Sequence, residues 1–220
     1  MKYAARFLLI FMALAFGGSL AHAQQTGASY EKGLKMVREA KYQAAMAEFL
    51  PLAQAGHAPS QFSVGLMYHL GRGVPKSLKT AYEWYKKAVL QEHVPSLNNV
   101  GMMYLNGEFV ARNRDVAFEL FKKASAQHAQ AKDNVAQCYE NAWGTERDIQ
   151  KAIEFYTLSG ESGYIAGFHH LGQLYEKDYP GFPKNIDKAV EFYIKAAEMK
   201  YGRARTRLFE LKRLPDRLKN

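Results

Sequence analysis

A repeat of 35 to 36 residues is the feature of this sequence that most limits how it can fold. Tyrosines recur at intervals of 36, 35 and 36 residues, at Tyr68, Tyr104, Tyr139 and Tyr175. Three residues before each tyrosine stands a small residue; we call these register residues, and they are Gly65, Gly101, Ala136 and Gly172. A fixed period of this length is typical of stacked supersecondary units, each too small to bury its apolar face alone. The sequence therefore predicts a solenoid.

Each unit is predicted to form two helices, which makes the fold all-α. Apolar residues recur at helical spacing around each register residue, and a glycine-rich segment such as 71–74 ends this first helix. The second helix carries a stripe with i, i+3, i+4, i+7 spacing, formed by Ala81, Trp84, Tyr85 and Ala88. This stripe predicts that Trp84 is buried between helices. Glu83 lies four residues before a lysine, which favours a solvent-exposed opposite face.

The segments 64–68, 71–74 and 81–88 resemble the Sel1-like repeat, a relative of the tetratricopeptide repeat. The resemblance covers four units, at 58–93, 94–128, 129–164 and 165–201, and a looser tetratricopeptide-like unit precedes them at 24–57. It implies a right-handed α-solenoid of stacked antiparallel helix pairs that binds a protein or peptide on its concave face. A basic capping helix and tail are expected over 202–220, with the helix running from Tyr201 to Arg213 and packing Ala204, Leu208 and Leu211 inward.

The resemblance also indicates where a partner would bind. Concave positions map onto the first helices, three residues before, one residue after and four residues after the register residue. The expected partner-binding residues are Tyr30, Leu34, Phe62, Leu66, His69, Asn98, Met102, Leu105, Asp133, Gln137, Glu140, His169, Gln173 and Glu176, with Val37 in the looser unit. They change from apolar to acidic along the chain, and we expect Asp133, Glu140 and Glu176 to be exposed. The alternative is that Leu66 and Met102 belong to the core.

No residue set indicates a reaction, a cofactor or a metal. His57, His93 and His128 recur at the repeat spacing, with Tyr164 next. Equivalent positions in stacked repeats lie about 8–10 Å apart or more, whereas zinc needs ligand atoms at about 2 Å, so we interpret these residues as inter-repeat junctions. Cys138 stands where other units have Met or Leu, which predicts an apolar packing role.

Motifs for metal, acyl-transfer, phosphate and redox chemistry are missing from the sequence. We therefore expect a non-enzymatic scaffold or adaptor. One alternative is a cell-envelope enzyme acting on peptidoglycan or a β-lactam, because such activity is attributed to a cysteine-rich branch of Sel1-like proteins. This chain has a single cysteine and lacks the cysteine pairs of that branch.

The first 23 residues have the pattern of a cleaved secretory signal. Lys2 and Arg6 precede an apolar run of ten residues, 7–16, and the small-residue segment Ala21-His22-Ala23 follows it. Ten apolar residues are too few to cross a bilayer of about 30 Å. The residue directly after Ala23 is Gln24 and not the cysteine that lipid attachment requires. We therefore expect a periplasmic or secreted protein.

Positive charge is concentrated after residue 201. Removing Lys2 and Arg6 from the 30 basic residues leaves 28 against 21 acidic ones, or +7 for residues 24–220. Seven basic and two acidic residues at 202–220 supply +5 of this, and the expected basic patch comprises Arg203, Arg205, Arg207, Lys212 and Arg213. A nearly neutral body argues against nucleic-acid binding. The tail is either a soluble cap or a weak tether to an anionic envelope surface.

Overall fold

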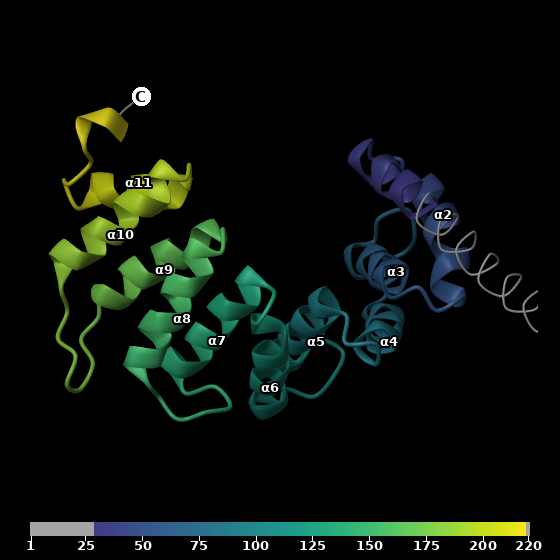
Figure 1. Cartoon of the computed structure of the whole chain (residues 1–220), viewed down its shortest axis with the longest axis horizontal. Helices are drawn as coiled ribbons and strands as arrows, with labels where there is room; N and C mark the ends of the chain where they lie inside the picture. The colour runs from purple at the N-terminus through teal and green to yellow at the C-terminus, as the bar shows by residue number, and fades with distance from the viewer. Residues whose placement is uncertain (1–28, 219–220) are drawn as a thin grey trace, which may run out of the picture. The chain divides into compact units, whose positions relative to one another are not determined.

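The computed structural model describes residues 29–218, so the predicted signal peptide at 1–23 lies outside the described residues. Residues 29–38 are helical, and the helices that follow are α2 (Tyr42–Gln54), α3 (Ala58–Leu70), α4 (Leu78–Val89), α5 (Val94–Asn106), α6 (Arg114–Ser125), α7 (Ala129–Asn141), α8 (Ile149–Glu161), α9 (Ile165–Tyr175), α10 (Ile186–Glu198), α11 (Gly202–Glu210) and the 3-10 helix Asp216–Leu218 (Figure 1). Over 29–218 the only β pairing is an isolated bridge between Tyr179 and Phe182. The all-α prediction is confirmed. None of the described helices has the length and apolar content to cross a membrane.

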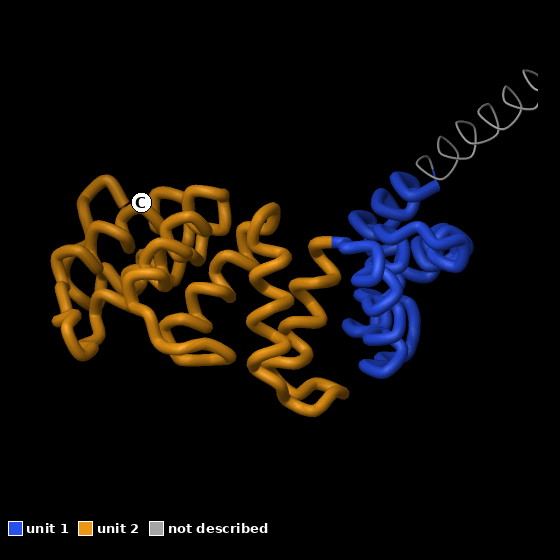
Figure 2. The backbone as a smooth tube through the Cα atoms, turned by 60° about the horizontal axis from the view of Figure 1, so that its bottom comes forward, with its two compact units in different colours: residues 1–93 blue, residues 94–220 orange. Residues whose placement is uncertain are grey.

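The chain divides into two compact units, one up to residue 93 and one from residue 94 (Figure 2). Within the first unit, α2 packs on α3 and α3 packs on α4. Within the second unit, each helix from α5 to α11 packs on the next one along the chain. Packing between successive helices is the plan of a solenoid, in which each helix pair is completed by its neighbours.

Both helices of a repeat begin at recognisable cap positions. The second helices α4, α6, α8 and α10 each follow a residue whose side-chain oxygen accepts a hydrogen bond from the backbone N–H three residues on; these residues are Ser77, Asn113, Asp148 and Asn185. The first helices α3, α7, α9 and α11 follow the N-cap residues His57, His128, Tyr164 and Tyr201. The Nδ1 atom of His128 accepts a bond from the Ala131 N–H at 3.2 Å. The interpretation of the histidines as junction residues is confirmed.

The register glycines allow an aromatic ring of the second helix to approach the first helix. A Cβ atom added at Gly65 would lie 2.7 Å from the Tyr85 ring, and one added at Gly172 would lie 2.6 Å from the Tyr193 ring. The four rings in this place are fully buried, and they belong to Tyr85, Phe121, Tyr156 and Tyr193. A side chain added at Gly65 or Gly172 would therefore push the ring and the first helix apart.

The prediction that Trp84 is buried between helices is wrong. Trp84 is only partly buried, at the edge of the core cluster of the first unit, and the Lys87 ammonium lies 4.0 Å from its ring centroid. Successive residues of a helix point about 100° apart, so residues 84 and 85 lie on opposite edges of the apolar stripe. Gly65 leaves room for the Tyr85 ring alone.

The last α-helix is shorter than expected. It spans Gly202–Glu210 rather than reaching Arg213, and Lys212 has a positive φ of 54° that a continuing helix does not allow. Ala204 and Leu208 are buried as predicted, whereas Leu211, the third residue expected to pack inward, is only partly buried against the same core. Leu214 and Leu218, beyond the helix, are partly buried against the same core.

Candidate functional site

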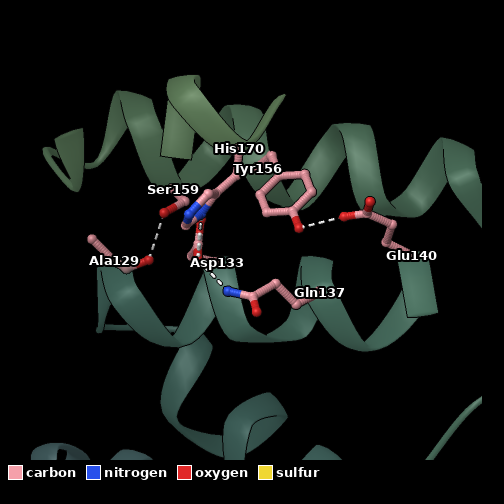
Figure 3. A network of polar contacts seen from close by, with 7 residues as sticks. All are labelled: Ala129, Asp133, Gln137, Glu140, Tyr156, Ser159 and His170. Carbon is pink, nitrogen blue, oxygen red and sulfur yellow. Dashed lines mark hydrogen bonds and ion pairs between the residues drawn. The ribbon is translucent and has the colours of Figure 1, made fainter. Parts of the chain in front are cut away.

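Asp133, predicted to be an exposed binding residue, is buried. Its side chain is 1% exposed, and its Oδ1 atom lies 2.8 Å from Nδ1 of His170 in the following repeat (Figure 3). Gln137, on the same helix, donates a hydrogen bond to Oδ2 at 2.8 Å. The carboxylate therefore joins two repeats, and Gln137 is partly engaged in the same contact.

Glu140 is also buried, with a side chain 5% exposed. Its carboxylate accepts hydrogen bonds from Tyr156 Oη at 2.7 Å, Lys177 Nζ at 2.6 Å and Tyr179 Oη at 2.7 Å. Burial alone would raise the pKa of this carboxyl, but the bonds from Lys177 and the two tyrosines outweigh it and lower the pKa overall. The expectation that Glu140 is exposed is wrong.

Glu176 is the third acidic residue that is bound by a side chain of the segment following its own repeat. Arg207 binds it with two parallel hydrogen bonds, Nε to Oε1 at 2.9 Å and Nη2 to Oε2 at 2.8 Å. The Glu176 side chain is only 18% exposed. Stacking places each residue beside one about a repeat length further on, and the sequence supplies a base 37 positions after Asp133 and after Glu140. The base that binds Glu176 is Arg207, 31 positions further on. The acidic positions therefore stabilise the stack and leave little carboxylate for a partner.

The positions three residues before the register residue are inter-repeat contacts in the second unit. Asn98 accepts a 2.8 Å hydrogen bond from Asn134 of the following repeat, and the ring of His169 lies 5.1 Å from that of the junction residue Tyr201. Asn98 and His169 are consequently buried, and the expectation that they form a binding surface is wrong.

The positions four residues after the register residue face the buried ring of the second helix. Glu140 bonds to Tyr156, and the ring of His69 lies 6.1 Å from that of Tyr85. Where the ring is Phe121, which has no hydroxyl, the facing position is Leu105, and both belong to one apolar cluster. The residue at these positions thus follows the chemistry of the internal ring: it is polar beside a tyrosine and apolar beside Phe121.

The apolar positions of the first unit lie together around a pocket of about 140 Å³. The predicted residues in its lining are Tyr30, Leu34, Val37, Phe62 and Leu66. The other residues of the lining were not predicted, and they are Tyr42, Phe49, Ser63, Met67, Leu70 and Arg72. Tyr42 and Phe49 come from a second helix, whereas the concave positions of the resembling repeat lie on first helices. Arg72 is the one charged residue in the lining, and its guanidinium carbon lies 5.3 Å from the Tyr42 ring centroid.

The remaining predicted positions divide between core and surface. Met102 is partly buried against the cluster of α6 and α7, which favours the alternative that it belongs to the core. Gln173 is exposed. Neither residue lines the pocket of the first unit.

Part of the basic patch is paired with acidic side chains. Arg207 contacts Glu176 and also Glu210, and Arg213 Nη2 lies 3.4 Å from Asp187. Within residues 29–218, the structure shows no ion pair for Arg203 or Lys212. These pairs hold the segment after α10 against the repeat before it, which favours the capping interpretation over a free tether.

Cys138 packs in the apolar cluster of α6 and α7, as predicted. Burial raises the pKa of its thiol to about 12, despite the opposing effect of Arg114, so the reactive thiolate is scarce at neutral pH. Among the described residues, no three His, Cys, Asp or Glu side chains are grouped so that they could hold a metal ion.

His169 is expected to make the fold sensitive to mild acid. Burial, followed by repulsion from His170 and Arg203, lowers the pKa of its ring to about 4, and Glu176 opposes the shift. The unfolded chain binds a proton near pH 6.5 and the folded chain near pH 4, so stability falls as the pH is lowered through this window. His169→Phe should reduce the loss between pH 7 and pH 4.5 by about 2 kcal/mol.

Urea unfolding of both proteins at the two pH values checks this expectation. Phenylalanine suits the site because Nδ1 of His169 has no hydrogen-bond partner among the described residues, and Tyr193 and Tyr201 pack on the ring. Equal pH dependence in the two proteins would contradict the assignment to His169.

A family model for the Sel1 repeat matches residues 58–93, 94–128, 129–164 and 169–201. The chain belongs to the Sel1 repeat family. This Sel1 repeat protein is 29% identical to a Sel1 repeat protein from Oxalobacter formigenes, with a TM-score of 0.74 over 81% of this chain and 73% of that one. It is 25% identical to a protective antigen of uropathogenic Escherichia coli that has an SLR fold, with a TM-score of 0.53, covering 84% of this chain and about half, 49%, of the antigen.

An immunity protein from Pseudomonas aeruginosa shares the fold at 15% identity, with a TM-score of 0.55 over 83% of this chain and 68% of that one. The comparison with curated proteins gave no match. The chain is therefore a scaffold of Sel1 repeats.

Proposed function

We propose that this Sel1 repeat protein is a non-enzymatic adaptor that binds a protein or peptide by enclosing an apolar side chain in the pocket of its first unit. The observation that supports the proposal is the pocket itself, into whose lining the fold brings Tyr30, Leu34, Phe62 and Leu66. Burial of one large apolar side chain is worth about 1.5–3 kcal/mol. A single anchor of this kind is typical of interfaces in which a few residues carry most of the affinity.

Arg72, the charged residue of the pocket lining, can orient the bound partner. Arg72 is exposed and lies against Tyr42, so its guanidinium can meet a carboxylate while the partner's apolar side chain enters the pocket. The expected ligand is therefore an apolar residue close to an acidic one. We further propose that the protein acts in the periplasm or after secretion, because residues 1–23 carry the pattern of a secretory signal.

Leu66→Glu and Leu34→Glu are each expected to weaken peptide binding at least tenfold, because both place a carboxylate in an apolar lining. Peptides selected from a random display library on the purified protein serve as ligands, and fluorescence anisotropy measures their dissociation constants. Far-UV circular dichroism checks that the variants remain folded. Leu90→Glu is the matched control, since Leu90 belongs to the same unit but is 78% exposed and outside the pocket.

The proposal fails if selected peptides bind the two pocket variants and the control with the same affinity. An enzyme of the envelope would be revealed instead by turnover of a chromogenic β-lactam or of peptidoglycan by the purified protein.

A further inference from the structure

Leu90 is an apolar residue at a position that the repeat leaves in water. Its side chain is 78% exposed. It stands three residues before the junction residue His93, and the same position of the last two repeats holds the exposed glutamates Glu161 and Glu198. The Leu90 side chain therefore adds little to the core of its own chain, and its apolar surface is accessible to another molecule.

An acidic residue follows Leu90 two positions later. Glu92 is exposed, and its φ of 56° turns the chain directly after α4. Gln91, between the two, donates hydrogen bonds to the backbone oxygen of Gly56 at 3.0 Å and to Oε1 of Gln61 at 2.9 Å. These bonds hold the segment 90–92 against the start of α3, which reduces the ordering cost when this segment binds.

The pocket of the first unit fits a leucine that has a carboxylate beside it. An apolar cavity of about 150 Å³ holds benzene, which has six carbon atoms, so a pocket of about 140 Å³ has room for the four carbon atoms of a leucine side chain. Arg72 belongs to the pocket lining and is exposed, and over residues 29–218 the structure shows no ion pair for Arg72 or for Glu92. The guanidinium and the carboxylate are therefore complementary in charge.

A single chain does not bring these two charged groups together. Helix α3 has 13 residues, which makes it about 20 Å long. Glu92 is held near the start of this helix through Gln91, whereas Arg72 follows its end. A second copy of the chain can place its own Glu92 beside Arg72.

We propose that this Sel1 repeat protein associates with itself, with Leu90 of one copy entering the first-unit pocket of another and Glu92 pairing with Arg72 there. The inference rests on the pocket proposed above as a binding site, and it names the occupant. The contact joins two different surfaces, so a chain that has lost one of them can still supply the other. The surface buried is small, and the association is therefore weak and reversible.

Sedimentation equilibrium of the whole protein up to millimolar concentration is expected to show association that increases with concentration. Leu66→Glu, which damages the pocket, and Leu90→Glu, which removes the bound side chain, should each be monomeric. Glutamate at position 90 suits the fold, because Glu161 and Glu198 occupy the same place in other repeats. A mixture of the two variants should form a one-to-one complex, since the first still carries Leu90 and the second still has the pocket.

Exchange of the two charges gives a second readout. Arg72→Glu and Glu92→Arg should each weaken the association at least tenfold, and the two changes combined in one chain should restore most of it. Phe209→Glu is the matched control: Phe209 is 71% exposed but belongs to the second unit, so this variant should associate like the wild type. Far-UV circular dichroism checks that every variant is folded.

A wild-type protein that stays monomeric at millimolar concentration would overturn the proposal. So would a mixture of Leu66→Glu and Leu90→Glu that forms no complex, or a loss of association in Phe209→Glu, which would assign the contact to the second unit. Binding of selected peptides separates this inference from the proposed function. If the peptides bind the pocket of a protein that stays monomeric, the second copy is wrong as the occupant and the pocket remains a binding site.

Discussion

Tyr85→Ala is expected to lower the free energy of unfolding by about 3–5 kcal/mol, the range for truncating a large buried aromatic residue. The Tyr85 ring is fully buried and lies against Gly65. Glycine has no side chain that could move into the space, so the cavity would persist and its full cost would appear. Urea denaturation followed by circular dichroism measures the change.

Two neighbouring residues provide the controls for Tyr85. Trp84→Ala should cost clearly less than Tyr85→Ala, because Trp84 is only partly buried. Glu83, which is exposed, should change stability by no more than about 0.5 kcal/mol when replaced by alanine. If Trp84→Ala proved as costly as Tyr85→Ala, the contact between ring and register glycine would not be the main apolar contact of the repeat.

Glu140→Ala is expected to lower the free energy of unfolding by about 3 kcal/mol, because it removes the centre of a buried polar network. Tyr156 would keep its hydroxyl inside the core without the carboxylate that accepts its bond at 2.7 Å. Lys177 and Tyr179 would lose their contacts with the preceding repeat. Thermal and urea unfolding measure the loss.

Glu191→Ala is the matched control for Glu140, since Glu191 is an exposed glutamate in a helix of the same unit. The pH dependence gives a second readout. The pKa of Glu140 is lowered in the fold, so its contribution is present above the ordinary glutamate pKa of about 4.3 and is lost as the pH falls through the lowered folded-state pKa. Stability of Glu140→Ala should therefore depend less on pH in this acidic range, and an unchanged unfolding midpoint at neutral pH would refute the network.

The fold could be predicted from the sequence because its main signal is repetition. The register residues and the turn segments recur often enough to show helix pairs without any knowledge of contacts. Choosing between Trp84 and Tyr85 was not possible in this way, because both lie within the apolar stripe. Only the direction of approach of the first helix, seen in the contact of Gly65 with the Tyr85 ring, separates them.

The acidic part of the candidate site was misjudged because a charged residue was assumed to face water. A signal was present in the sequence: a base stands 37 residues after each of Asp133 and Glu140, at His170 and Lys177. One repeat length plus one residue is the spacing that brings two side chains together on neighbouring first helices. The pocket of the first unit was better predicted, because aromatic and aliphatic residues gather wherever helices leave space.

The polar contacts between first helices make the repeats of the second unit non-interchangeable. If residues 129–164 were excised, the repeat 165–201 would follow 94–128 directly, and the apolar contact of ring and register residue would survive within each remaining repeat. His170 would then meet Asn98 in place of Asp133, and Lys177 would meet Leu105 in place of Glu140. Duplication of a repeat can lengthen such an array, but these polar pairs form only when the repeats stand in their present order. A change of that order would leave the paired groups without their partners.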